Sequence, residues 1–191
     1  MISGVILAGG LGRRMGNIDK GLQELRGRPM VSWVAERLGP QVDELLINAN
    51  QNLEQYATFG YPVVPDQIPD FAGPLAGLHA ALSAAAHPLV ATAPCDSPFL
   101  PTDLVSRLHA ALFAGGADLA VARTFDQPHP VFCLCQRKVL PHLTEFLQGG
   151  GRKVDRWYAT LKVIEVAFDD EAEAFENINT RDELARFDSG Q

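Results

Sequence analysis

The chain has 191 residues, a length that suits one domain with a substantial buried core. Its formal net charge of −7 argues against a nucleic-acid partner, because such a partner is usually met by a broad basic surface. Three cysteines do not build a disulfide framework and indicate a reducing compartment. No apolar run reaches the about 20 residues of a membrane span, and the N-terminus lacks the basic leader of a signal peptide. We therefore expect a cytoplasmic protein with no membrane partner.

The first half of the chain alternates strands with helices. Gly4–Ala8 is a continuous apolar run that two glycines end, a pattern typical of a strand buried in a parallel sheet. Pro29–Leu38 reads as a helix, since proline suits a first helical turn and Gly39-Pro40 follows as a stop signal. The next expected elements are strand Glu44–Asn48, strand Tyr61–Val64 and helix Pro74–Ala86.

The second half continues the alternation. The expected elements are strand Leu89–Ala93, a helix capped by Thr102 and running to Ala114, strands Leu119–Arg123 and Val131–Cys135, helix Arg137–Leu147, strand Leu161–Phe168 and a terminal helix Thr180–Phe187. Such alternation predicts a mostly parallel central sheet with helices on both faces, that is, a three-layer α/β/α sandwich. No repeat or linker interrupts it, so we expect a single domain over residues 1–191.

Polar and turn-forming residues gather after four of the expected strands. Ligands of such sheets bind beyond the carboxyl ends of the strands, which directs attention to these loops. Their sequences are GGLGRRMGNIDKG (9–21), ANQN (49–52), PDQIPDFAGPLAG (65–77) and PCDSPFLP (94–101).

The first of these loops combines glycines with cations. Glycine lets backbone N–H groups approach a phosphate closely, and Arg14 and Lys20 add charges that suit phosphate oxygens. A Walker A motif is absent, because Leu22-Gln23 follow Gly21 in place of Lys and Ser or Thr. A GxGxxG fingerprint also fails, because Met15 stands where its last glycine belongs.

The pattern LAGGxxxRMG followed by DK resembles a loop of the nucleotidyltransferases that join an NTP to a phosphorylated acceptor. Within them the chain is most similar to the molybdenum cofactor guanylyltransferases, although Gly12 stands where relatives often carry serine. Further motifs of that family follow in order over almost the whole chain: NAN (48–50), PD (65–66), GPLAG (73–77), PCDSP (94–98), HP (129–130) and NINT (177–180).

The resemblance implies a Rossmann-like nucleotidyltransferase fold and transfer of GMP from GTP to molybdenum-molybdopterin, with release of pyrophosphate. It implies Mg²⁺ as cofactor, and partner proteins that insert molybdenum and mature molybdoenzymes. It places Leu7, Ala8, Gly9, Asn48 and Asp66 around the nucleotide. The glycines and charges of the loops add Gly10, Lys20 and Asp96 to this nucleotide set, and the expected catalytic residues are Arg14, Lys20 and Asp96.

Asp96 is the expected metal ligand on two grounds. It follows a buried strand, and Mg²⁺ typically takes one or two carboxylates together with substrate phosphates and water. Its structural alternative is to cap the helix near Thr102, but it lies far upstream of that helix. The resemblance assigns Asp96 the same metal role. Neighbouring Cys95 is interpreted as a small buried residue rather than a nucleophile, because the sequence shows no histidine near it.

Asn48 and Asp66 end two strands, and each has two interpretations. Either one can stabilise its own turn, or acceptor groups there can pair with the N1–H and N2–H₂ donors of guanine. Asn177 and Asn179 precede the expected terminal helix and can simply lead into it. In the resembling family this NxN segment reaches back into the active site, so both are candidate site residues.

Two other functions remain open from the sequence. One is a related transferase that uses CTP or a sugar phosphate, which base selectivity would distinguish. The other is a non-catalytic GTP-binding protein that delivers cofactor to apo-enzymes. The presence of Arg14, Lys20 and Asp96 argues against the second function, and release of pyrophosphate would separate it from an enzyme.

Overall fold

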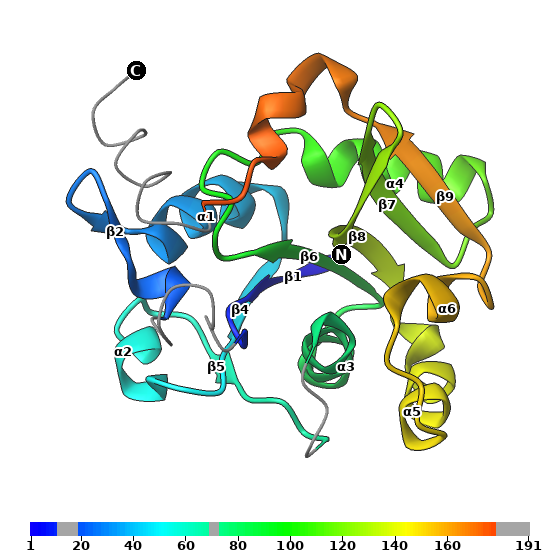
Figure 1. The fold of residues 1–191 in the computed structure, drawn as a ribbon, viewed down its shortest axis with the longest axis horizontal. Coiled ribbons are helices and arrows are strands. Elements are labelled where there is room, and N and C mark those ends of the chain that lie inside the picture. The colour runs from blue at the N-terminus through cyan, green and yellow to red at the C-terminus, as the bar shows by residue number, and fades with distance from the viewer. Residues whose placement is uncertain (11–18, 69–72, 179–191) are drawn as a thin grey trace.

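The computed structural model describes residues 1–10, 19–68 and 73–178 (Figure 1). Within this part a seven-stranded sheet has the order β5-β4-β1-β6-β8-β7-β9. Its strands are β1 Ile2–Leu7, β4 Glu44–Asn48, β5 Val63–Val64, β6 Leu89–Pro94, β7 Leu119–Thr124, β8 Gln127–Gln136 and β9 Val163–Ala167. A separate small hairpin pairs β2 Glu24–Leu25 with β3 Arg28–Pro29.

The pairing confirms the expected mostly parallel sheet. β1 pairs in parallel with β4 and β6, β4 with β5, and β7 with β9, whereas β8 is antiparallel to both of its neighbours. β8 begins at Gln127, four residues before the expected start at Val131. The chain turns at Phe125, whose φ is 51°, and returns at once against β7. Pro128 and Pro130 are tolerated because β6 pairs only with the later part of β8.

Helices cover both faces of the sheet, which confirms the three layers (Figure 1). α1 and α4 pack on one face, and α3, α5 and α6 on the other. The helices are α1 Met30–Leu38, α2 Leu53–Ala57, α3 Pro74–Ala84, α4 Leu104–Ala114, α5 Leu140–Gln148 and α6 Val154–Tyr158, and shorter 3-10 turns are η2 Lys20–Leu22, η3 Gly39–Gln41, η4 Arg137–Val139 and η5 Asp169–Phe175. None of the described helices is long and apolar enough to cross a membrane.

The start of α4 differs from the expected cap at Thr102. The helix begins at Leu104, and Asp103 at the N-cap position makes no side-chain cap bond. One N–H of the first turn is satisfied by another element, because Val105 N donates to Gln41 Oε1 at 2.9 Å. The expected helix Thr180–Phe187 lies outside the described residues.

The strand order creates the place for a ligand. From β1 the chain crosses to β4 on one side, and later returns as β6 on the other side of β1. Crevices of doubly wound sheets form at such a switch point, beyond the carboxyl ends of the strands. Here Leu7 lies opposite both Asn48 and Pro94, so three expected ligand loops leave the sheet side by side.

Candidate active site

A cavity of about 400 Å³ opens at the carboxyl ends of β1, β4 and β6. Polar and glycine residues from four separate loops line it. The lining includes every described member of the predicted nucleotide set, namely Leu7, Ala8, Gly9, Gly10, Lys20, Asn48, Asp66 and Asp96. The other lining residues are Gly73, Pro74, Gly77, Pro94, Cys95 and Val131.

Lys20 and Asp96 form an ion pair in this cavity. Lys20 Nζ lies 3.0 Å from Asp96 Oδ2, although the two residues are 76 positions apart in the chain. Asp96 is buried, with 7% of its surface exposed, and the Lys20 side chain is 24% exposed. Charge-assisted hydrogen bonds of this kind are stronger than neutral ones. The end of β6 and the start of η2 therefore present one anion and one cation to the same space.

A second polar cluster joins β4 to the loop after β5. Asn48 Nδ2 donates to Asp66 Oδ1 at 2.9 Å and to the Val64 carbonyl at 3.0 Å. Asn50 Nδ2 donates to Asp66 Oδ2 at 3.0 Å, and Asp66 N donates to Asn50 Oδ1 at 2.8 Å. Each carboxylate oxygen of Asp66 thus accepts one amide bond and keeps lone pairs for a ligand. Asn50 was not among the expected site residues, although the NAN motif contains it.

Two glycines make room for these asparagines. A Cβ at Gly77 would lie 2.8 Å from Asn48 Oδ1 and 3.2 Å from Leu7 Cδ2. A Cβ at Gly9 would lie 2.8 Å from Asn50 Nδ2. Real Cβ atoms avoid such distances, so any side chain at either position would displace an asparagine. The glycines of LAGG and GPLAG therefore shape the polar cluster and do more than form turns.

The segment that follows η5 comes back to the Asp96 loop. Ser97 Oγ donates to Asn177 Oδ1, and Ile178 N donates to the Asp96 carbonyl at 2.8 Å. The structure therefore brings Asn177 next to the candidate metal ligand. Arg14 and Asn179 lie outside the described residues.

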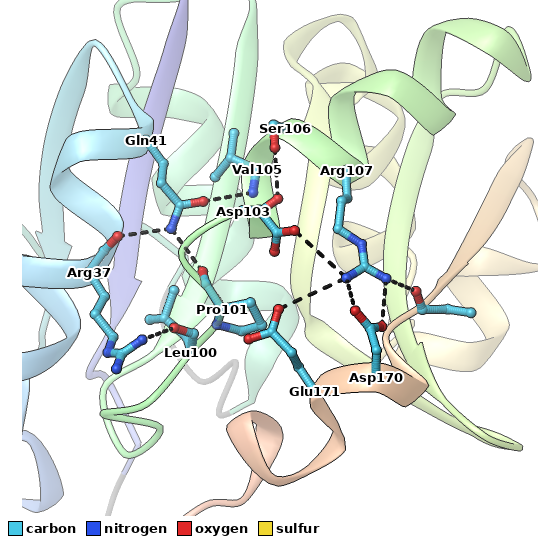
Figure 2. Close-up of polar contacts among 11 residues, drawn as sticks. Arg37, Gln41, Leu100, Pro101, Asp103, Val105, Ser106, Arg107, Asp170 and Glu171 are labelled. Carbon is cyan, nitrogen blue, oxygen red and sulfur yellow. Dashed lines mark hydrogen bonds and ion pairs between the residues drawn. The ribbon is translucent and has the colours of Figure 1, made fainter.

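Two polar clamps, one made by Arg37 and Gln41 and the other by Arg107, hold the loop after Asp96 and the η5 segment (Figure 2). Arg37 Nη1 donates to the Leu100 carbonyl at 3.1 Å, and Gln41 Nε2 donates to the Pro101 carbonyl at 2.9 Å. On the other side, both terminal nitrogens of Arg107 contact the Asp170 carboxylate at 2.9 Å, which ties α4 to η5. The loop after Asp96 and the segment leading to Asn177 are thereby attached to α1, η3 and α4.

The cysteines and His129 have structural roles in the packing of the protein. All three cysteines are free and buried, and burial raises the pKa of the Cys95 thiol well above its usual range. A protonated thiol is a weak nucleophile, which agrees with the structural interpretation of Cys95. The ring of His129 stacks on Phe175 with centroids 4.9 Å apart, and its Nε2 lies 2.7 Å from Thr124 Oγ1.

The donor set suits a hard divalent cation that arrives with phosphates. Among the described residues, no group of three or more His, Cys, Asp or Glu side chains could hold a metal without help. The cavity offers the carboxylate oxygens of Asp96, and Mg²⁺ is commonly bound through one or two carboxylates plus substrate phosphates. Asp96 therefore fits Mg²⁺ bound together with a nucleotide.

Comparison with known proteins identifies the family of the chain. The family described as "MobA-like NTP transferase domain" matches residues 4–163. A molybdenum cofactor guanylyltransferase of Cupriavidus necator is 57% identical over 188 residues, covering 96% of this chain and 94% of its own. One of Ralstonia nicotianae is 53% identical over 192 residues, with the same two coverages.

Solved structures extend the comparison. Molybdopterin-guanine dinucleotide biosynthesis protein A of Archaeoglobus fulgidus superposes with a TM-score of 0.81 at 26% identity, covering 99% of this chain and 97% of its own. A 4-diphosphocytidyl-2C-methyl-D-erythritol synthase of Anaerococcus prevotii shares only the fold, with a TM-score of 0.70 at 14% identity and coverages of 100% and 97%. The chain belongs to the MobA-like NTP transferases and, among them, to the family of the molybdenum cofactor guanylyltransferases.

Proposed function

We propose that this chain transfers GMP from GTP to molybdenum-molybdopterin, which yields the molybdopterin guanine dinucleotide cofactor and pyrophosphate. One observation carries the proposal. The cavity at the switch point of the sheet combines the Lys20–Asp96 pair with the Asn48–Asp66 cluster, in a chain more than 50% identical to guanylyltransferases. The first suits a triphosphate and its metal, and the second suits a purine base.

The reaction requires that the substrates be positioned and that their charge be stabilised, and it does not require a proton-transfer group. The acceptor is already a phosphate, so it attacks the α-phosphorus of GTP without a general base. Holding two polyanions in line and stabilising the charge that develops between them are then the main tasks. In this proposal Lys20 and Arg14 neutralise the triphosphate, and backbone N–H groups at Gly9 and Gly10 lie at its oxygens.

Asp96 is proposed to hold Mg²⁺. When bound, the ion polarises phosphate oxygens and stabilises charge on the departing pyrophosphate. Asp96 is buried beside Lys20, so a carboxylate for the ion and an ammonium for a phosphate lie together in the cavity. Asn177 contacts the residue after Asp96 and is proposed to hold that loop in place.

Guanine selection is proposed to rest on acceptor groups. Guanine presents donors at N1 and N2 and an acceptor at O6. The carboxylate of Asp66 keeps lone pairs beyond the two amide bonds that it accepts, and the carbonyls at Leu7 and Ala8 lie at the same strand ends. These acceptors suit the two adjacent donors of guanine, whereas cytosine would present its acceptors N3 and O2 to them.

The proposal extends to the cellular context. Three free and buried cysteines suit a reducing compartment, in line with the expected cytoplasmic location. The product is a finished cofactor that must reach apo-enzymes, so we include proteins that insert molybdenum and mature molybdoenzymes among the partners.

A turnover assay tests the proposed function. The protein is incubated with Mg²⁺, molybdenum-molybdopterin and each of GTP, CTP, ATP and UTP in turn, and nucleotide consumption and pyrophosphate are measured. We expect consumption of GTP alone, with one pyrophosphate per dinucleotide formed. Use of CTP would favour the cytidylyl alternative, and GTP binding without pyrophosphate would favour a cofactor-delivery protein.

A further inference from the structure

The residue before Lys20 is held by a different element of the fold. Asp19 Oδ1 accepts a hydrogen bond from the hydroxyl of Tyr56, and Asp19 Oδ2 accepts one from Asn52 Nδ2 at 3.1 Å. Tyr56 belongs to α2, and Asn52 is the N-cap residue of the same helix. We call Asp19, Asn52 and Tyr56 the Asp19 anchor.

The carboxylate of Asp19 does not cap the helical turn that it precedes. Asp19 is the N-cap residue of η2, where an aspartate ordinarily accepts a bond from the backbone of its own helix. No such side-chain bond forms, because the carboxylate turns towards α2. The Asp19 anchor therefore connects η2 to α2, instead of stabilising the N-terminus of η2.

Tyr56 also contacts the other flank of Lys20. Its side chain is fully buried, and a Cβ at Gly21 would lie only 2.5 Å from its hydroxyl oxygen. The same Cβ would lie 3.3 Å from Cys95 Cβ, next to Asp96. Tyr56 thus packs against the residue after Lys20, close to the residue that precedes Asp96. Burial raises the pKa of Tyr56 above its usual range, which keeps its hydroxyl protonated and able to donate to Asp19.

We propose that Tyr56 and Asn52 act through Asp19 as positioning residues for Lys20, holding the lysine where it meets the triphosphate. A lysine side chain is long and flexible, so fixing the backbone on both of its sides lowers the ordering cost of binding. The ion pair of Lys20 with Asp96 shows the arrangement that the anchor maintains. This inference rests on the proposed function.

The first test compares Tyr56→Phe with wild type, using calorimetric titration of GTP with Mg²⁺ and steady-state transfer. The variant keeps the ring and removes one hydrogen bond to a charged group, so we expect GTP affinity to fall about tenfold. Tyr61→Phe is the matched control, because Tyr61 lines a separate groove beside α1 and β4. It should keep wild-type affinity. Unchanged affinity in Tyr56→Phe would overturn the inference.

A double-mutant cycle separates positioning from general stability. If Tyr56 acts through Lys20, Tyr56→Phe should change GTP affinity less than twofold in a Lys20→Ala background, because the group it positions is gone. An effect of equal size in both backgrounds would overturn the inference. If Tyr56→Phe does not fold, Asn52→Gly takes its place in the cycle, since Asn52 is exposed and its φ of 52° suits glycine.

A third test exchanges the two residues Asp19 and Asn52 and asks whether the exchange restores GTP affinity. Each single variant breaks their hydrogen bond, because Asp19→Asn places an amide donor against the amide donor of Asn52, and Asn52→Asp places two carboxylates together. The double variant restores one donor and one acceptor in exchanged places, and the hydroxyl of Tyr56 can still donate to the oxygen of the new asparagine. We expect it to bind GTP within about threefold of wild type, which is less than 1 kcal/mol. A double variant no better than the single ones would contradict the anchor.

The failure of this inference is distinguishable from the failure of the proposed function. If Lys20→Ala binds GTP with unchanged affinity, the proposed nucleotide site itself is contradicted. Loss of affinity in Lys20→Ala together with none in Tyr56→Phe would leave that site in place and overturn only the anchor.

Discussion

Asp96 carries the most specific chemical assignment at the scale of single residues. An amide is a poor ligand for Mg²⁺, so Asp96→Asn should lose roughly 10²-fold in turnover, the size typical of removing one group that stabilises transition-state charge. Activity is measured at limiting Mg²⁺, and circular dichroism verifies folding. Near-wild-type activity at limiting Mg²⁺ would make the metal assignment wrong.

Gly77 tests the shape of the polar cluster. In the middle of a helix alanine is ordinarily favoured over glycine by about 1 kcal/mol. At Gly77 the new Cβ would lie 2.8 Å from Asn48 Oδ1, so Gly77→Ala should displace Asn48 and weaken GTP binding about tenfold or more. Gly39→Ala is the control, because its Cβ would meet Leu45 Cδ2 at an ordinary 3.8 Å. Equal GTP affinity in the two variants would contradict the role given to Asn48.

The sequence predicted the residues that lie at strand ends or in the loops that follow them. Asn48 ends β4, Asp66 and Asp96 follow β5 and β6, and Lys20 lies in the glycine-rich loop after β1; all four line the cavity, because strand ends in a doubly wound sheet converge on one edge. Asn50 acts through side-chain hydrogen bonds to Asp66, and Gly77 acts by leaving room for the side chain of Asn48. Spacing along the chain does not reveal such contacts between elements. Asp19 belongs to the same class, since its partners lie on α2.

At the scale of elements, the polar clamps beside the Asp96 loop yield a stability prediction. Gln41 accepts from Val105 N and donates to the Pro101 carbonyl (Figure 2). Gln41→Leu leaves these backbone groups unpaired, so the free energy of unfolding should fall by about 1–3 kcal/mol. Urea denaturation measures the change, and Gln148→Leu at an exposed position is the control. A loss no greater than that of the control would show that the clamp contributes nothing.

Elements with strong local signals were predicted well. Glu44–Asn48 has the expected bounds, because an apolar run between turn residues defines a buried strand. The early start of β8 was missed, since Pro128 and Pro130 argue against a strand unless part of it pairs on one side only. The short α2, whose tyrosine belongs to the Asp19 anchor, has too few residues to show a helical period.

At the scale of the whole molecule, two histidines set the response to mild acid. Burial lowers the pKa of both His79 and His129 below the ordinary value of 6.5. Their neutral forms are favoured by folding, so stability is fully present above about pH 6.5 and is lost as pH falls below it. The lowered carboxyl pKa of Glu44 acts only at more acid pH, near and below its ordinary 4.5.

We therefore expect the melting temperature to fall between pH 7.5 and pH 5.5. His79→Gln should reduce this dependence, because it removes one of the two histidines whose pKa is lowered in the folded protein. Calorimetry measures the melting temperatures of the wild-type protein and of His79→Gln. A wild-type melting temperature that does not change over this range would contradict the role given to the two histidines. The expected single domain also remains a prediction, which one cooperative transition in the same scans would support.

Base selectivity is the most direct measurement of the central claim, that this cavity binds GTP for guanylyl transfer. Wild-type protein is given GTP and CTP together with Mg²⁺ and molybdenum-molybdopterin, and the ratio of the two kcat/KM values is determined. Cytosine cannot make the two hydrogen bonds that the N1–H and N2–H₂ donors of guanine would give, and hydrogen bonds to a charged group contribute about 1.5–3 kcal/mol each, which predicts a preference for GTP on the order of a hundredfold or more. Asp66→Ala should erode that ratio more than it weakens triphosphate binding. Equal use of GTP and CTP by the wild-type protein would contradict the account.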